Sequence, residues 1–83
     1  MDNRIGVVGV VVEDLDSSNA VNAILHDHSS IIVGRMGIPY REKGVSVMSL
    51  IVDGTSDEIS AMTGKLGKIS SVSVKSAMTK VMD

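Results

Sequence analysis

The sequence predicts an α+β fold in which a four-stranded antiparallel sheet carries two helices on one face. Three observations lead to this prediction: the order of β-type and helix-type segments, the apolar alternation within the β-type segments, and a length of 83 residues, which suits one domain over 1–83. The order is strand, helix, strand, strand, helix, strand, which is the ferredoxin-like, or split βαβ, pattern. The expected order across the sheet is fourth, first, third, second strand, with the second and fourth strands at the edges.

The first half of the chain supplies two strands and one helix. Residues 4–13 are rich in valine and predict a buried strand. The period then changes, and Asp16 or Ser17 is expected to cap the start of a helix. The expected apolar stripe of this helix is Leu15, Ala20, Ala23 and Ile24, with Val21 as a weaker member. Residues 30–37 predict the second strand.

The second half repeats this arrangement. Residues 43–53 predict the third strand, and Thr55 with Glu58 fits a capping box that begins the second helix. Gly67 is expected to end that helix. Residues 72–80 alternate apolar and polar side chains, as expected of an edge strand. The buried stripe of the second helix is expected to be Ile59, Met62, Leu66 and Ile69.

The first and third strands are apolar on both faces, although two helices cover one face of the sheet only. In the first strand Ile5, Val7 and Val11 alternate with Val8, Val10 and Val12. In the third, Val45, Val47 and Ile51 alternate with Met48, Leu50 and Val52. Strands that are apolar on both faces are typical of strands buried on both sides. The sequence therefore predicts a homo-oligomer, a homodimer or homotetramer, in which a second copy covers the open face. The alternative is a monomer with short exposed valine patches.

Composition argues against several classes of function. The net charge of −2 and a single aromatic residue give neither attraction for nucleic acid nor a platform for stacking bases, so no direct nucleic-acid partner is expected. The chain has no cysteine, no signal-peptide pattern and no apolar run near the roughly 20 residues of a membrane span. A cytoplasmic protein without a membrane partner is expected.

The segment between the second and third strands holds the most distinctive residues. It contains Gly34, Arg35, Gly37 and Tyr40 beside the chain's one proline, Pro39. Arg35 could pair with a carboxylate or phosphate in a forked geometry, and the two glycines would let a backbone or ligand approach closely. Tyr40 is a suitable interface anchor. The alternative is a plain hairpin whose connection is the polar turn 41–44.

The stretch "VEDLDSSNAVNAILHDHSSIIVGRMGIPYREKGVSVMSLIVDG", and within it "IVGRMGIPYREKGVSV", resembles the iron-only hydrogenase system regulators. The resemblance covers nearly the whole chain and implies an ACT-like, ferredoxin-like domain with a regulatory role. More distantly, the pattern is similar to the effector domain of nickel-responsive regulators. The histidine and cysteine nickel site of those proteins does not carry over, because cysteine is absent.

In ACT-like domains the loop between the first strand and first helix contributes to an effector pocket between subunits. The resemblance therefore makes Asp14, Asp16 and Ser17 candidate ligand-binding or interface residues, where amides at the helix start would hold an anion. The alternative role of this loop is helix capping. His26 and His28 are weak metal candidates, since residues two apart do not share a helix face.

No catalytic or cofactor-binding pattern is present. The serines lack a histidine and acid partner at a meaningful spacing, and Gly6 and Gly9 lie inside a strand instead of after one, so they are not a dinucleotide fingerprint. The expectation is a non-enzyme without a cofactor. The favoured hypothesis is a homo-oligomeric module that binds a small anionic effector or amino acid. The alternative is a protein–protein interaction or structural module with no small ligand.

Overall fold

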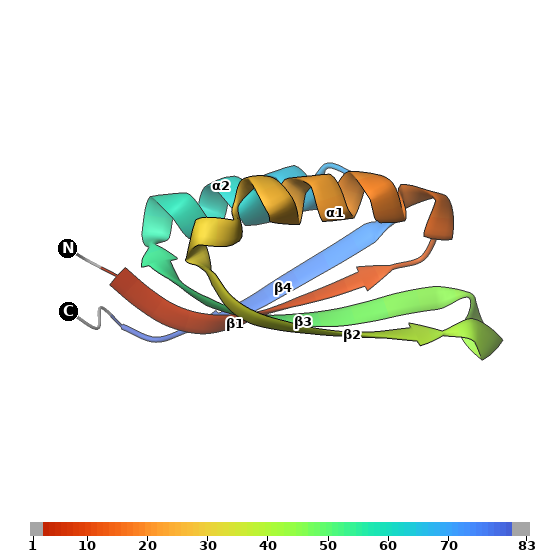
Figure 1. Ribbon diagram of the computed structural model, residues 1–83, viewed down its shortest axis with the longest axis horizontal. Helices are drawn as coiled ribbons and strands as arrows, with labels where there is room; N and C mark the ends of the chain where they lie inside the picture. The colour runs from red at the N-terminus through yellow and green to blue at the C-terminus, as the bar shows by residue number, and fades with distance from the viewer. Residues whose placement is uncertain (1–2, 81–83) are drawn as a thin grey trace.

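The computed structural model describes residues 3–80 and confirms the predicted architecture, with an antiparallel sheet as one layer and two helices as the other (Figure 1). The strands lie across the sheet in the order β2-β3-β1-β4, as predicted. The strands are β1 (Asn3–Val12), β2 (Ile32–Tyr40), β3 (Val45–Thr55) and β4 (Val72–Met78), and the helices are α1 (Ser18–Asp27) and α2 (Ser56–Gly67). Short 3-10 turns precede α1 (Leu15–Ser17), follow it (Ser29–Ile31) and join β2 to β3 (Arg41–Lys43).

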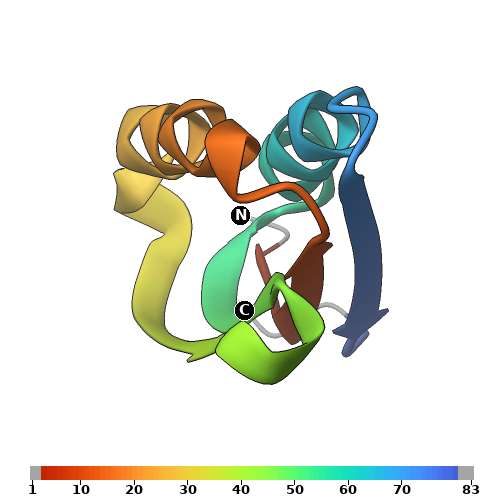
Figure 2. The ribbon, with the colours of Figure 1, turned by 90° about the vertical axis from the view of Figure 1, so that its right-hand side faces the viewer.

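The two helices lie side by side on one face, with α1 over the β2 side of the sheet and α2 over the β4 side (Figure 2). No helix within residues 3–80 combines the length and apolar character needed to cross a membrane. The second strand begins and ends later than predicted, because a 3-10 turn occupies Ser29–Ile31 and pairing with β3 continues to Tyr40 opposite Val45. Pro39 lies in this edge strand, where its missing N–H is tolerated.

The core fills the space between the sheet and the helices. The inward row of β1 and β3 consists of buried aliphatic side chains, and α2 contributes its predicted stripe, with Ile69 partly buried beside it. Apolar burial of this kind is the main favourable term in folding. The fully buried members are Val8, Val10, Val12, Val21, Leu25, Leu50, Val52, Met62 and Leu66.

The prediction for α1 was partly wrong: Val21 is buried and Ile24 packs against the core as predicted, but the other members of the stripe do not. Leu15 lies before the helix and is half exposed, Ala20 and Ala23 face solvent, and the buried residues are Val21 and Leu25. The side chain of Asp14 accepts from the Asp16 N–H and caps the preceding 3-10 turn, not α1 itself. Ser17 occupies the predicted N-cap position of α1, but no side-chain hydrogen bond caps the start of the helix.

The start of α2 is the predicted capping box. The Thr55 hydroxyl accepts from the Glu58 N–H at 3.1 Å, and Glu58 Oε1 accepts from the Thr55 N–H at 2.8 Å. Hydrogen bonds from the Thr55 backbone and then from its side chain lower the pKa of Glu58. A carboxyl group whose pKa is lowered by folding stabilises the folded protein at pH values above its ordinary pKa. This stabilisation is lost as the pH falls through the folded-state pKa. The helix ends at Gly67, as predicted. Among the described residues, the one glycine with a positive φ is Gly44, at 69°, which follows the turn between β2 and β3.

Thr55→Ala should lower the free energy of unfolding by about 1 kcal/mol, because an orphan N–H of the first helical turn loses its acceptor. Urea unfolding followed by circular dichroism measures this at neutral pH. Thr63→Ala is the matched control on the same helix, where alanine is the better helix former. Equal losses in the two variants would contradict the capping role of Thr55.

Candidate functional site

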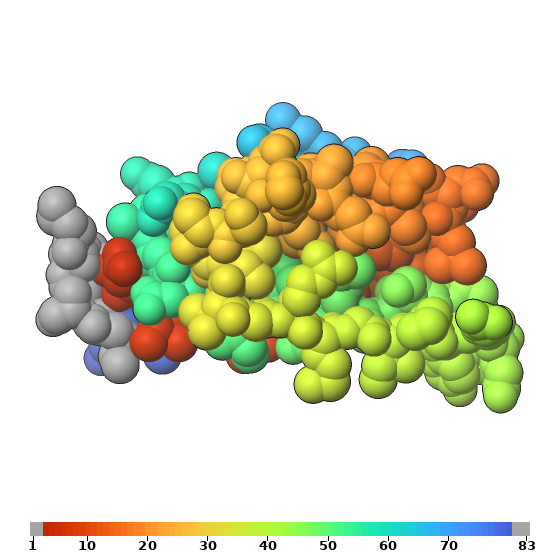
Figure 3. Space-filling model, in the orientation of Figure 1, coloured from red at the N-terminus to blue at the C-terminus, as the bar shows by residue number. Residues whose placement is uncertain are grey.

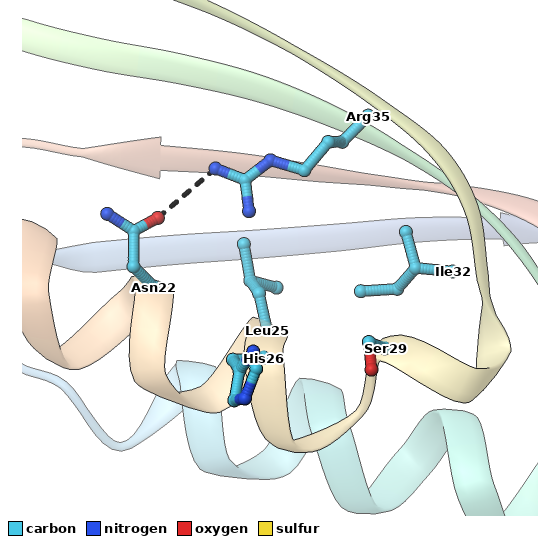
Figure 4. A pocket seen from close by; sticks show the side chains of 6 residues that line it. All are labelled: Asn22, Leu25, His26, Ser29, Ile32 and Arg35. Atoms are coloured by element: carbon cyan, nitrogen blue, oxygen red, sulfur yellow. Dashed lines mark hydrogen bonds between the residues drawn. The ribbon is translucent and has the colours of Figure 1, made fainter.

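A polar groove lies between α1 and the edge strand β2, on the helix side of the sheet (Figure 4). It has a volume of about 430 Å³. The buried Leu25 and the partly buried Ile32 supply its apolar side chains, and polar side chains from three separate elements surround them. The lining residues are Asn22, Leu25, His26, Ser29, Ile32 and Arg35.

A β-bulge at the start of β2 turns Arg35 into this groove. Ile32 pairs with Val52, whereas Gly34 pairs with Ile51, so the strand carries one extra residue at Val33. Without that residue, the strict alternation from the inward-facing Ile32 would send Arg35 to the open face of the sheet. With it, Arg35 lies opposite the buried Leu50 and faces the helices. Bulges commonly redirect a side chain in this way near functional sites.

The guanidinium of Arg35 is oriented by one hydrogen bond, in which Nη2 donates to Asn22 Oδ1 at 3.2 Å (Figure 4). Asn22 and His26 are four residues apart and therefore share one face of α1. Ser29 adds a hydroxyl from the turn that follows the helix. No carboxylate is among the lining residues in the described chain, so the arginine charge is unneutralised within the groove.

The other hairpin candidates do not join Arg35 in one site. Gly34 and Tyr40 pair with Ile51 and Val45 and belong to the open face of the sheet, whereas Gly37 pairs with Met48 on the helix side. A Cβ at Gly34 would meet nothing within 4 Å. Tyr40 is 46% exposed at the end of β2. The four residues therefore divide between the two faces of one strand.

The loop candidates Asp14, Asp16 and Ser17 lie at the other end of α1. Asp14 accepts from the Asp16 N–H at 3.0 Å, and the Ser17 hydroxyl is 2.8 Å from that of Ser71. The Glu13 N–H donates to the Ser71 carbonyl at 2.8 Å. These contacts tie the loop to the connection between α2 and β4. Within one chain, the loop and the Arg35 groove are separate places.

The two histidines have different neighbours. His26 lines the groove, while Nε2 of His28 is 3.1 Å from Nζ of Lys65 on α2. Within residues 3–80, no group of three histidine, aspartate or glutamate side chains is arranged to hold a metal ion. His26 therefore lies among the polar side chains of the groove, whereas His28 contacts α2.

The open face of the sheet is apolar across β1 and β3, as the sequence pattern predicts, and exposed apolar residues of β2 extend it. Part of the β2 segment projects below the sheet, on the side away from the helices (Figure 3). A hollow of about 160 Å³ lies on this face, lined by Gly34, Arg35, Met36, Ser49 and Ile51. The exposed apolar residues of the face are Ile5, Val7, Met36, Ile38, Tyr40, Val47 and Ile51, and these seven residues are called the open-face patch below.

Two polar lining residues of the groove, Asn22 and Ser29, are not predicted as site residues from the sequence. Asn22 and His26 are four residues apart in the sequence, and this spacing indicates that both lie on one face of the helix. Nothing in the local sequence shows that Arg35 faces them, because that depends on the bulge.

Comparisons with known proteins agree with the fold and define the family. The class is an ACT-like, ferredoxin-like domain: the ACT domain of a GTP pyrophosphokinase from Chlorobium tepidum superposes with a TM-score of 0.73 at 18% identity, over 93% of this chain and 89% of that one. The chain belongs to the family described as "TM1266-like: Iron-only hydrogenase system regulator, putative", whose model matches residues 4–76. The comparison with curated proteins gives no match.

Two further solved structures are informative. The uncharacterised protein TM1266 from Thermotoga maritima shares 38% identity and a TM-score of 0.89, over 94% of this chain and 99% of that one. A nitrogen regulatory PII-like protein, CPII from Thiomonas intermedia K12, has a TM-score of 0.60 at 8% identity, over 96% of this chain and 92% of that one. That structure is described as bound to ADP, AMP and bicarbonate. The likeness to CPII and to the ACT domain concerns the fold alone.

Proposed function

We propose that the protein is a regulatory module that binds a small anionic effector in the groove between α1 and β2 and assembles through the open-face patch. The observation that carries the proposal is Arg35, a guanidinium without a carboxylate partner in the groove and oriented by Asn22 at 3.2 Å. Membership of a family of hydrogenase-system regulators supports a regulatory role over a catalytic one.

The groups around the groove favour an anion with several oxygens. Arginine presents N–H donors in a fixed fork that matches carboxylate and phosphate oxygens. Asn22, His26 and Ser29 supply further hydrogen-bonding groups around the same space. The apolar side chains of Leu25 and Ile32 would contact an aliphatic part of the ligand. An amino acid or another small carboxylate has both an anionic group and an aliphatic part, so it fits these polar and apolar side chains. A phosphate-bearing metabolite is the next candidate.

The open-face patch supports self-association. Contiguous apolar surface on a small protein marks an interaction site, and a second copy is a partner with the same apolar surface. The hollow beside Gly34 has about 160 Å³, close to the roughly 150 Å³ cavity that takes up benzene in another protein, so it suits one side chain of the partner copy. Arg35 and Met36 are neighbours in β2 on opposite faces of the sheet, which would connect effector binding with assembly.

Thermal-shift measurements at fixed protein concentration test the effector site, using amino acids, small carboxylates, bicarbonate and nucleotides. A ligand at 100 times its Kd stabilises the folded state by about 2.7 kcal/mol, which corresponds to a rise in Tm on the order of 10 °C for a domain of this size. Arg35→Gln and Arg35→Glu should abolish the shift. Arg41→Gln, in the β2–β3 turn outside the groove, should retain it.

A shift that persists in both Arg35 variants would refute the groove as the effector site. The second candidate function, a protein–protein interaction module without a small ligand, is favoured by the open-face patch. It predicts that none of the compounds changes Tm while self-association or capture of a partner persists.

A further inference from the structure

A second arginine lies under the opposite helix, away from the groove. Arg4 is opposite Gly54 in the register of β1 and β3, and it continues the inward row formed by Gly6, Val8 and Val10. Its Nε is shielded from solvent and has no hydrogen-bond partner within residues 3–80. A guanidinium remains charged at all ordinary pH values, and a buried donor without an acceptor is energetically costly. A hydrogen-bond acceptor bound beside Arg4 would therefore stabilise its buried Nε–H group.

The space beside Arg4 is a small pocket lined by four hydroxyl groups and by the apolar side chains of Ile59 and Met78. It has a volume of about 80 Å³, several times the roughly 10–15 Å³ needed for one water and suited to an ion of a few heavy atoms. Ser56, Ser60 and Thr63 line it from α2, where their spacing places them on one side of the helix. Ser76 lines it from β4.

Ser76 interrupts an apolar row. The residues of β4 on the helix side are Val72, Val74, Ser76 and Met78, which pair with the inward row of β1. Val72 is buried, and Val74 and Met78 pack against the core. A hydroxyl both donates and accepts, so it can complete the coordination of an anion that an arginine holds. No carboxylate lines the pocket in the described part of the chain, and the nearby Glu58 carboxylate accepts from the Thr55 N–H.

We propose that Arg4, Ser56, Ser60, Thr63 and Ser76 form a site for one phosphate group, distinct from the effector groove. The guanidinium of Arg4 would supply the positive charge and its Nε–H donor to one phosphate oxygen. The serine and threonine hydroxyls would contact the other phosphate oxygens. The size of the pocket admits the phosphate group and leaves any attached group outside. The site takes lining residues from α2 and β4, whereas the groove takes them from α1 and β2. Figure 2 shows these two pairs of elements on opposite sides of the molecule.

Isothermal titration calorimetry with inorganic phosphate, at ionic strength held constant with chloride, tests the site. The wild-type protein should bind phosphate, and Arg4→Gln should weaken binding by at least 10-fold. Ser76→Ala and Ser60→Ala should each weaken it several-fold, and these small substitutions keep the test informative if Arg4→Gln fails to fold. Arg41→Gln, in the β2–β3 turn outside both the pocket and the groove, is the matched control and should bind phosphate as the wild type does.

Competition by AMP identifies the source of the phosphate. If AMP displaces inorganic phosphate, and Arg4→Gln but not Arg41→Gln removes this effect, the site takes the terminal phosphate of a larger molecule. If AMP does not compete, it takes the free ion. Absence of phosphate binding in the wild type, or binding that survives Arg4→Gln undiminished, would overturn the proposal. The Arg4 results leave the test of the effector groove unaffected, because that test depends on Arg35.

Discussion

Ile51→Glu should yield a folded monomer, whereas the wild-type protein should form an oligomer. Ile51 lies on the outward face of β3, 41% exposed in the single chain, between Val7 of β1 and Gly34 of β2. The carboxylate would remain hydrated in a monomer. In an oligomer that buries the open-face patch it would lose its water without gaining a partner, and an unpaired buried charge costs several kcal/mol.

Sedimentation equilibrium over a range of protein concentrations measures the change, with circular dichroism as the check on folding. Ala61→Glu is the matched control, because it introduces the same charge at an exposed position of α2. The control should assemble as the wild type does. An Ile51→Glu variant with the wild-type mass, or a wild-type protein that remains monomeric at the highest concentrations, would contradict assembly through the open-face patch.

Leu50→Ala should remove much of the stability of the fold. Leu50 is adjacent to Ile51 in sequence, but it is fully buried on the helix side of β3. Truncating a buried leucine to alanine costs about 2–5 kcal/mol, because apolar contacts are lost and a cavity remains. Small domains have a total free energy of unfolding of about 5–15 kcal/mol, so the variant should be partly unfolded at moderate temperature.

Urea unfolding measures this loss, at one protein concentration for every variant so that any contribution of assembly is the same. Val33→Ala is the control, since Val33 lies at the bulge of β2 and is 70% exposed. It should cost well under 1 kcal/mol. Similar losses at positions 33 and 50 would mean that the inward row does not form the core.

The fold was predictable because its signals are local and repeat along the chain. The capping box of Thr55 and Glu58 and the two-sided alternation of β1 and β3 each depend on residues close in sequence. The predicted stripe of α1 was partly wrong because its two alanines are small and lie on the solvent side of the helix. The helical spacing of Val21, Ile24 and Leu25 indicates the face that packs against the core.

The candidate site was less predictable because it depends on a long-range pairing. Whether Arg35 faces the helices or the open face depends on how β2 pairs with β3, and one extra residue at Val33 reverses the answer. The predicted hairpin residues therefore separate between the two faces, with Arg35 in the groove and Gly34 and Tyr40 on the open face. Asn22 joins the site only because α1 packs beside that strand.

The bulge and Pro39 also limit how copies of this chain can add to one another. An edge strand offers unpaired backbone groups on which another strand can continue the sheet, and proline and bulges make an edge a poor template for such growth. Strand β2 has both features along its edge. Edge-to-edge addition, which would extend into an unlimited ribbon, is thereby disfavoured, while stacking of open faces about a twofold axis closes after a fixed number of copies. In the proposed assembly, the strand that carries the candidate effector arginine would thus also keep the number of copies finite.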